Sequence, residues 1–330
     1  MKAHIRSMTM AALALLAGAS LQACGDSSSA SGESSAARQA AAKDVIRQAL
    51  AVNPKADSAR ISLTIDGEVQ GIPRLKGPIE VTVDGRYNLP DGATVPDVEF
   101  DVGLFHNGHA LGGGLKLVDG TAYVTLGSTG YKIPDDITRK LMAPAADANN
   151  GLTKTGAMFH VNPQDWQRDA QRTGTTKVAG VDVDVLEAGI RLDRAFLDLD
   201  RFVRFLASLG VTQAVGLPGE LGPELRAALE RSVTHARGKV WIGSDDHVLR
   251  KAQLVGRGAV APRDRELLYG ATGAQLKAIL NITDVGVPQQ ISVPQHIDSY
   301  ASLQGALSAL GESVRHEVRA ARREARAASR

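Results

Sequence analysis

The feature that most restricts the fold is a series of five short segments in which apolar and polar residues alternate. These segments are Ile61–Ile65, Ile79–Val83, Val98–Leu104, Leu115–Leu117 and Ala122–Leu126. Side chains two residues apart lie on the same face of a strand, so each segment buries one face and exposes the other. Strands that follow one another without crossover helices exclude a doubly wound α/β domain. They predict a meandering antiparallel sheet.

Glycine dipeptides supply candidate turns between these strands. Asp84-Gly85, Asn107-Gly108 and Asp119-Gly120 are typical of tight hairpins, because their residues tolerate positive φ. Three consecutive glycines at 112–114 instead fall inside a strand pattern, where glycine often marks a bend of a curved sheet. We therefore expect successive hairpins in a curved sheet.

Helical periodicity is clearest over Arg191–Leu209. The apolar stripe of this segment consists of Leu192, Phe196, Leu199, Phe202, Val203, Leu206 and Leu209. Weaker patterns predict helices over Ala40–Ala51, Asp135–Met142, Pro163–Gln171 and Pro223–His235. Further strands are expected over Thr176–Leu186 (a pair around the turn at 179–180), Lys239–Gly243, Val248–Gly256, Gln275–Val285 and Ile291–Val293. Sheet and helices together give the α+β class.

The segment between the last two helices, Val211–Gly222, is apolar for a loop. It contains Val211, Val215, Leu217 and Leu221, so full solvation is disfavoured. Together with the stripe of 191–209, it offers more apolar surface than one sheet face needs. We expect part of this surface to face a ligand space; the alternative is that the stripe packs on the sheet.

The N-terminus predicts export and lipid anchoring. Lys2 and Arg6 precede a short apolar run from Met8 to Leu16, too short to span a bilayer, and Leu21-Gln22-Ala23-Cys24 follows. This pattern resembles the bacterial lipoprotein signal, which implies that the Cys24 thiol receives a diacylglyceryl group and becomes the new N-terminus. The alternative is an ordinary secretory signal. Cys24 is the one cysteine of the chain, so no internal disulfide can form.

The expected organisation has four parts. Residues 1–23 form a signal peptide, 24–39 a Ser/Ala-rich tether, 40–302 a lipid-binding half-barrel domain and 303–330 a basic, helical C-terminal extension. The anchored chain is expected at the cell membrane on its extracytoplasmic side, with palmitate-like acyl chains on Cys24. Six arginines against three glutamates in residues 312–330 indicate a solvated helix or tail, or a contact with anionic headgroups.

Composition and motifs argue against several functions. Removal of Lys2 and Arg6 with the signal leaves 36 of 38 basic residues against 36 acidic ones, and this balance disfavours nucleic-acid partners. Aromatic residues make up 4% of the chain, too few for a carbohydrate groove of stacked rings. His106 and His109 flank a hairpin turn without further ligands of matching spacing, and no Gly-x-Ser-x-Gly motif is present. We expect no enzyme, no cofactor and no metal.

Four stretches carry a family resemblance through their pattern and order. Thr121–Pro134, Val178–Ala188, Lys239–Leu254 and Asn281–Pro294 resemble the LppX/LprG family of actinobacterial lipoproteins, which are related to LolA-like half-barrels. The resemblance covers Asp44 to Ser302; the loop 260–273 and the chain beyond Leu303 do not align. It implies a strongly curved antiparallel β-sheet with helices on its concave face, enclosing an apolar cavity for acyl chains. It brings no catalytic residues.

The function expected from this resemblance is carriage of a lipid or glycolipid across the cell envelope, with an unknown exporter or acceptor protein as partner. The alternative is a structural or chaperone-like lipoprotein that holds a protein segment. The residues expected to line the cavity are Val81, Val83, Phe100, Leu117, Val124, Phe196, Leu199, Phe202, Val203, Leu206, Leu217, Leu225 and Leu229.

The anchoring hypothesis predicts that Cys24→Ser releases or mislocalises the protein, because the substitution removes the acceptor thiol. Cell fractionation measures this. A Cys24→Ser protein that stayed as membrane-bound as wild type through high-salt washing would show the lipoprotein assignment to be wrong.

Overall fold

The computed structural model describes residues 35–49, 56–107, 109–146, 162–208, 212 and 218–306. Cys24, Leu217, the apolar positions 211 and 215 and residues 307–330 of the expected extension 303–330 lie outside the described residues, so the expectations for them stay predictions. Helix α2 begins at Ser35, five residues before the expected start at Ala40. The end of the expected tether is therefore helical.

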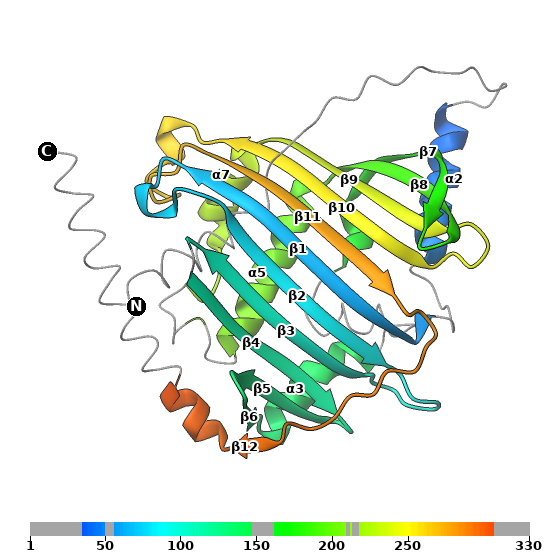
Figure 1. The fold of residues 1–330 in the computed structure, drawn as a ribbon. Helices are drawn as coiled ribbons and strands as arrows, with labels where there is room; N and C mark the ends of the chain where they lie inside the picture. The colour runs from blue at the N-terminus through cyan, green and yellow to red at the C-terminus, as the bar shows by residue number, and fades with distance from the viewer. Residues whose placement is uncertain are drawn as a thin grey trace, which may run out of the picture.

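A single twelve-stranded sheet forms the body of the described chain (Figure 1). Neighbouring strands pair antiparallel, except that β12 pairs parallel with β6, and the sheet is not closed into a barrel. The order is β12-β6-β5-β4-β3-β2-β1-β11-β10-β9-β8-β7, so two meanders meet where β1 pairs with β11. The bounds are β1 Ser58–Gln70, β2 Ile79–Asn88, β3 Asp97–His106, β4 His109–Val118, β5 Thr121–Leu126, β6 Thr129–Lys132, β7 Gln167–Val178, β8 Val181–Ile190, β9 Val233–Gly243, β10 Leu249–Ala259, β11 Gly273–Thr283 and β12 His296–Asp298.

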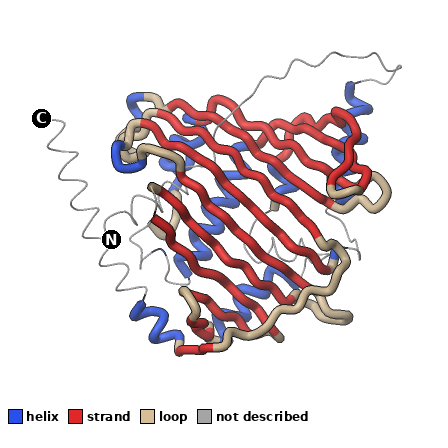
Figure 2. Tube along the Cα trace, viewed as in Figure 1, coloured by secondary structure: helices blue, strands red, loops and turns tan. Residues whose placement is uncertain are grey.

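The helices lie on one side of the sheet, behind it in the view of Figure 2, and we call this side the helix-bearing face. They are α2 Ser35–Ala49, α3 Asp135–Ala146, α5 Leu192–Ser208 and α7 Gly222–Ser232, with short 3-10 turns at Pro73–Leu75, Pro163–Trp166 and Pro262–Asp264. Helix α5 crosses behind the central strands, α3 lies near β5, and α2 covers β7 and β9 (Figure 1).

Three hydrophobic clusters fix these helices to the sheet. Cluster 1 joins α5 and α7 to one end of the central strands through Phe196, Leu229, Ile79, Leu104 and Leu276. Cluster 2 joins α3 to the other end of the sheet, and its buried members include Leu141, Tyr87, Val98, Phe100 and Leu117. Cluster 3 packs Ala42, Ile46 and Ala49 of α2 against Ala170, Leu186 and Ile242. The apolar core is therefore distributed around the rim of the sheet.

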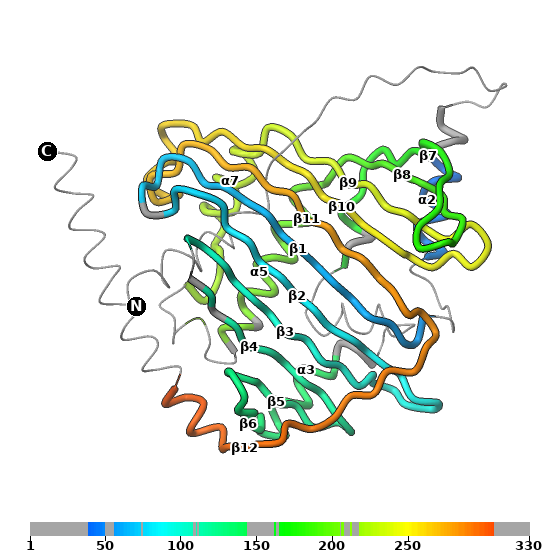
Figure 3. The backbone as a smooth tube through the Cα atoms, in the orientation of Figure 1, coloured from blue at the N-terminus to red at the C-terminus, as the bar shows by residue number. Residues whose placement is uncertain are grey.

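The opposite, outer face is polar and carries a strap formed by residues 285–295, which runs from β11 to β12 (Figure 3). Beneath it, Glu99 lies 2.6 Å from both the Arg86 and the Lys116 side chains, and Lys116 also donates to the Ser292 carbonyl at 3.5 Å. Burial alone would raise the pKa of Glu99, but the hydrogen bonds from Lys116 and Arg86 outweigh it and lower that pKa. The triad therefore stays charged while it supports the strap.

Several sequence predictions are confirmed. Turns follow β3, β4 and β7 at Asn107, at residues 119–120 and at residues 179–180, and α5 matches the expected helix 191–209 within one residue at each end. The predicted α+β class is also confirmed. The apolar cavity that the resemblance implied is not outlined by the described residues and stays a prediction.

The turn expected at Asp84-Gly85 is wrong. Both residues lie inside β2, where Gly85 pairs with Phe100 of β3. The Phe100 ring lies across the Gly85 backbone, in the space that a Cβ would occupy. Glycine is needed here for the close approach of an aromatic ring, not for a turn.

Three further boundaries differ from expectation. The helix expected over 163–171 is a single 3-10 turn, because Gln167 already starts β7 and pairs with Ile190 of β8. The helix expected over 223–235 ends at Ser232, where β9 begins its pairing with β10. The strand expected over 291–293 is part of the strap, and β6 was missed. At Gln167 and Val233, long-range strand pairing overrides local helix propensity.

The packing of Phe100 on Gly85 predicts that Gly85→Ala destabilises the fold by about 1–3 kcal/mol, as overpacking does. An added Cβ would meet the Phe100 ring and lie 2.8 Å from the Glu99 carbonyl oxygen. Gly112→Ala in β4 is the matched control, since its nearest neighbour would be the Val102 carbonyl oxygen at 3.5 Å. Urea unfolding measures both. Equal midpoints for the two variants would contradict the packing argument.

Candidate functional site

A row of directly paired apolar residues crosses the middle of the helix-bearing face. We call it the central row, and it runs over six adjacent strands, from β3 through β2, β1, β11 and β10 to β9. Its members in order are Val102, Val83, Leu63, Leu280, Ala252 and Val240. Because each residue is the register partner of the next, the row lies perpendicular to the strands. At about 4.8 Å per strand it spans roughly 24 Å.

The central row is less buried than the residues on either side of it. Val102 is 43% exposed and the other five are partly buried. Further along the same strands, Ile79 and Leu276 in cluster 1 are at most 2% exposed, and Tyr87 and Ile282 in cluster 2 at most 3%. The row therefore follows a seam between the clusters, where apolar side chains are incompletely covered by protein.

The structure distributes the predicted lining residues over this face. Val81, Phe196, Leu199, Leu225 and Leu229 belong to cluster 1 or pack against it. Val83, Phe100, Leu117 and Val124 belong to cluster 2 or pack against it. Val203 on α5 is 1% exposed, whereas Phe202 and Leu206 are partly buried. Of the predicted set, only Val83 lies in the central row.

Two buried carboxylates hold α5 over this face. Asp198, 3% exposed, accepts hydrogen bonds from the Asn162 backbone N–H at 2.8 Å and the Trp166 indole N–H at 3.0 Å. Asp200, also 3% exposed, accepts from the Leu221 backbone N–H at 2.8 Å. Arg201 and Arg204 neutralise the two carboxylates from the solvent side. The segment before β7 and the segment before α7 are thereby tied to one turn of α5.

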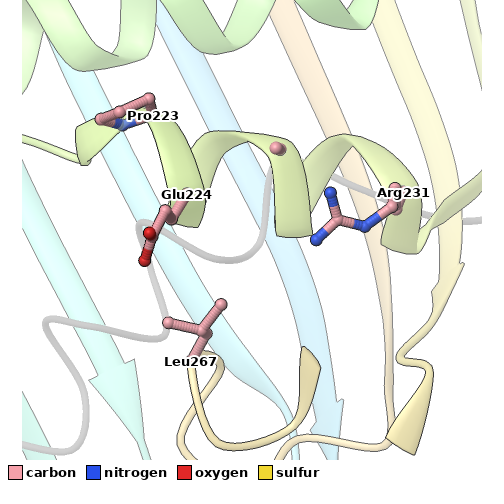
Figure 4. A pocket seen from close by; sticks show the side chains of 5 residues that line it. Pro223, Glu224, Arg231 and Leu267 are labelled. Atoms are coloured by element: carbon pink, nitrogen blue, oxygen red, sulfur yellow. The ribbon is translucent and has the colours of Figure 1, made fainter. Parts of the chain in front are cut away.

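A hollow opens beside α7, at the end of the sheet where β10 turns into β11 (Figure 4). Its volume is about 430 Å³, within the range of small-molecule pockets, and Pro223, Glu224, Ala227, Arg231 and Leu267 line it. Leu267 comes from the loop between β10 and β11 and points toward the helix. The hollow is therefore bounded by a helix on one side and by a loop on the other.

This loop is clamped to α7 by an ion pair. Arg231 of α7 donates to Asp264 through Nε at 3.2 Å and through a terminal guanidinium nitrogen at 2.7 Å. The Asp264 side chain is 4% exposed, and the hydrogen bond from Arg231 holds the pKa of this carboxyl below its ordinary value. Leu268, the residue after Leu267, is buried in cluster 1.

His106 is committed to structural contacts. The side chain is 2% exposed, with Nδ1 3.1 Å from the Pro78 carbonyl oxygen and Nε2 3.0 Å from the Asn107 amide nitrogen. Within the described ranges, no group of three or more His, Cys, Asp and Glu side chains is placed to hold a metal ion. The same part of the chain contains no helix that is long and apolar enough to cross a membrane.

Sequence reasoning missed most of the central row and both buried carboxylates. Alternation placed Leu63 and Val102 on an apolar strand face, but it could not tell which row lies midway between the covered ends. The sequence offers one weak signal for these carboxylates. Asp198 follows the apolar Phe196 by two residues, but this spacing does not reveal the partners in other segments that make its burial possible.

Comparison with known proteins gives structural neighbours only, since no family model and no curated protein matches the chain. LprF from Mycobacterium bovis is 12% identical, with 77% of this chain and 97% of that chain covered and a TM-score of 0.42. Lipoprotein LppX from Mycobacterium tuberculosis is 13% identical, with 77% and 99% covered and a TM-score of 0.37. A LolA superfamily protein from Nitrosomonas europaea is 9% identical, with 77% and 94% covered and a TM-score of 0.22.

These neighbours confirm the resemblance predicted from the sequence, because LprF, LppX and a LolA superfamily protein are among the matched structures. Sequence identity and TM-score are low in every case. The ligand and the partners of this chain have to be argued from its own residues.

The Arg231–Asp264 clamp predicts that Asp264→Asn lowers the melting temperature at neutral pH, because the charge-assisted pair is lost. The folded pKa of Asp264 lies below the ordinary 3.8, so its contribution is present above pH 3.8 and is lost as pH falls further. The difference between wild type and variant should therefore shrink below that pH.

Asp182→Asn is the control, since Asp182 forms an exposed pair with Lys177 that should contribute little. Melting curves between neutral and strongly acidic pH measure both variants. A pH-independent difference for Asp264→Asn would contradict the ion-pair argument.

Proposed function

We propose that the protein is a membrane-anchored lipoprotein that binds the acyl chains of a lipid or glycolipid along the central row and carries that lipid across the cell envelope. The observation that carries the proposal is the seam itself. Six paired apolar residues on the helix-bearing face are only partly covered, between ends that are fully buried. A long, thin, apolar ligand fits such a row.

The chemistry of the row supports an acyl chain. None of its six side chains can donate or accept a hydrogen bond, so the ligand portion that lies there must be apolar. Ten methylenes buried on it would contribute roughly 8 kcal/mol, against association costs of at least about 4 kcal/mol. A lipid can therefore be held by its chains while its headgroup stays in a polar environment.

The same row disfavours an extended protein segment as the ligand. Strands β1, β2, β10 and β11 are each paired on both sides, so their backbone groups are already used within the sheet. An extended peptide on this face would leave its own N–H and C=O groups over apolar side chains, which is costly. The chaperone-like alternative is therefore less compatible with this surface than a lipid.

The decisive substitution is Val102→Trp, because this side chain is 43% exposed on the helix-bearing face and an indole there would obstruct the row. We expect lipid loading to fall severalfold with little change in melting temperature. Overpacking of a solid core would instead cost about 1–3 kcal/mol of stability. Val287→Trp on the strap is the control, as a valine with 53% exposure that lies outside the central row.

Mass spectrometry of lipid extracts from the purified, unacylated protein measures loading, and a lipid-transfer assay measures exchange. Loading of Val102→Trp equal to that of Val287→Trp, with the fold intact, would contradict binding along the row. Repeated absence of any co-purifying lipid from the wild type would contradict the carrier function itself.

A further inference from the structure

The loop between β10 and β11 presents two large apolar side chains to solvent. Leu267 is 40% exposed and Tyr269 is 55% exposed, the largest value among the exposed large hydrophobic residues of the described chain. Leu268 between them is buried in cluster 1. The loop therefore turns Leu268 into the core and leaves Leu267, at the rim of the α7 hollow, and Tyr269 exposed to solvent.

The exposure of this pair is enforced by the loop's own bonds. The Tyr269 and Gly270 backbone N–H groups donate to the Glu266 and Arg265 carbonyls at 3.3 and 2.7 Å. Tyr269 itself has a φ of 56°, a conformation uncommon for a bulky residue that persists only where the surroundings impose it. With the Asp264 clamp, these bonds prevent Tyr269 from folding back onto the sheet.

The exposed charges of the loop itself are mainly positive, while Glu224 of α7 lines the hollow beside it. The Arg263 side chain is 75% exposed and Arg265 is also exposed. Asp264 is buried and bonded to Arg231, so Glu266 is the remaining exposed carboxylate of the loop. Aromatic rings and leucines with adjacent arginines are typical of protein surfaces that enter the interface of a bilayer with anionic headgroups.

We propose that this loop docks the protein on an anionic membrane surface, with Leu267 and Tyr269 in the headgroup region and Arg263 and Arg265 against lipid phosphates. The inference deepens the proposed function, because Leu267 also lines the hollow beside α7. A bilayer at this position would stand next to an opening of the helix-bearing face. The loop then selects the end of the sheet at which lipid enters or leaves.

The test uses the full chain with Cys24→Ser, so that no acyl anchor contributes. Co-sedimentation measures its binding to vesicles of phosphatidylcholine with phosphatidylglycerol and to vesicles of phosphatidylcholine alone. The paired variant Leu267→Ser/Tyr269→Ser removes the apolar tip, and Arg263→Gln/Arg265→Gln removes the charges. The control is Val287→Ser/Val293→Ser, two valines with 53% and 49% exposure beyond the opposite end of β11.

We expect each loop variant to bind the anionic vesicles roughly tenfold less than the parent chain, and the strap control to bind equally. The parent chain should also bind vesicles of phosphatidylcholine alone more weakly than it binds the anionic vesicles. A chain truncated before residue 312 separates the loop from the basic extension, and it should retain loop-dependent binding. All altered side chains of the loop are exposed, so melting temperatures should stay unchanged.

Loop variants that bind like the parent, binding that vanishes entirely on truncation, or a parent chain that binds no anionic vesicles would each overturn the proposal. Lipid loading measured on the same preparations separates this inference from the proposed function. Normal loading without vesicle binding refutes docking alone, and vesicle binding without loading refutes carriage alone.

Discussion

The pairing of β1 with β11 is the constraint on which the rest of the structure depends. Eleven residues, Arg60–Gln70, pair with 273–283 across more than 200 positions of sequence, and this ladder joins the two meanders into one sheet. Without it, each meander would have an unpaired edge in the middle of the molecule. The register of this ladder also brings Leu63 opposite Leu280, which makes the central row continuous.

The width of the sheet explains why its core is divided. Helices of 11 to 17 residues cannot cover twelve strands as one layer, so each secures one part of the rim. Between these parts the apolar face of the sheet persists, because alternation places an apolar residue there in every strand whether or not a helix covers it. A seam between clusters is thus a consequence of geometry.

Sequence patterns could establish strands β1 to β5, helix α5 and the hairpin connections after β3, β4 and β7, since each depends on neighbours in the chain. They could not explain why position 85 requires glycine, because the cause is the close approach of the Phe100 ring from the neighbouring strand. The start of β7 at Gln167 and of β9 at Val233 depends likewise on partners elsewhere in the sequence. The central row was accessible only through register, which no local pattern specifies.

The buried carboxylates of α5 show how an incompletely covered face can still be rigid. A helix lying over a seam has fewer apolar contacts than one over a solid core, so packing alone locates it less well. Asp198 and Asp200 accept directional bonds from the backbone N–H groups of Asn162 and Leu221, and their charges make these bonds stronger than neutral ones. Loss of the Asp200 acceptor would leave the buried Leu221 N–H without this partner. The position of α5 over the sheet is therefore set by these polar bonds together with the packing of Phe196 in cluster 1.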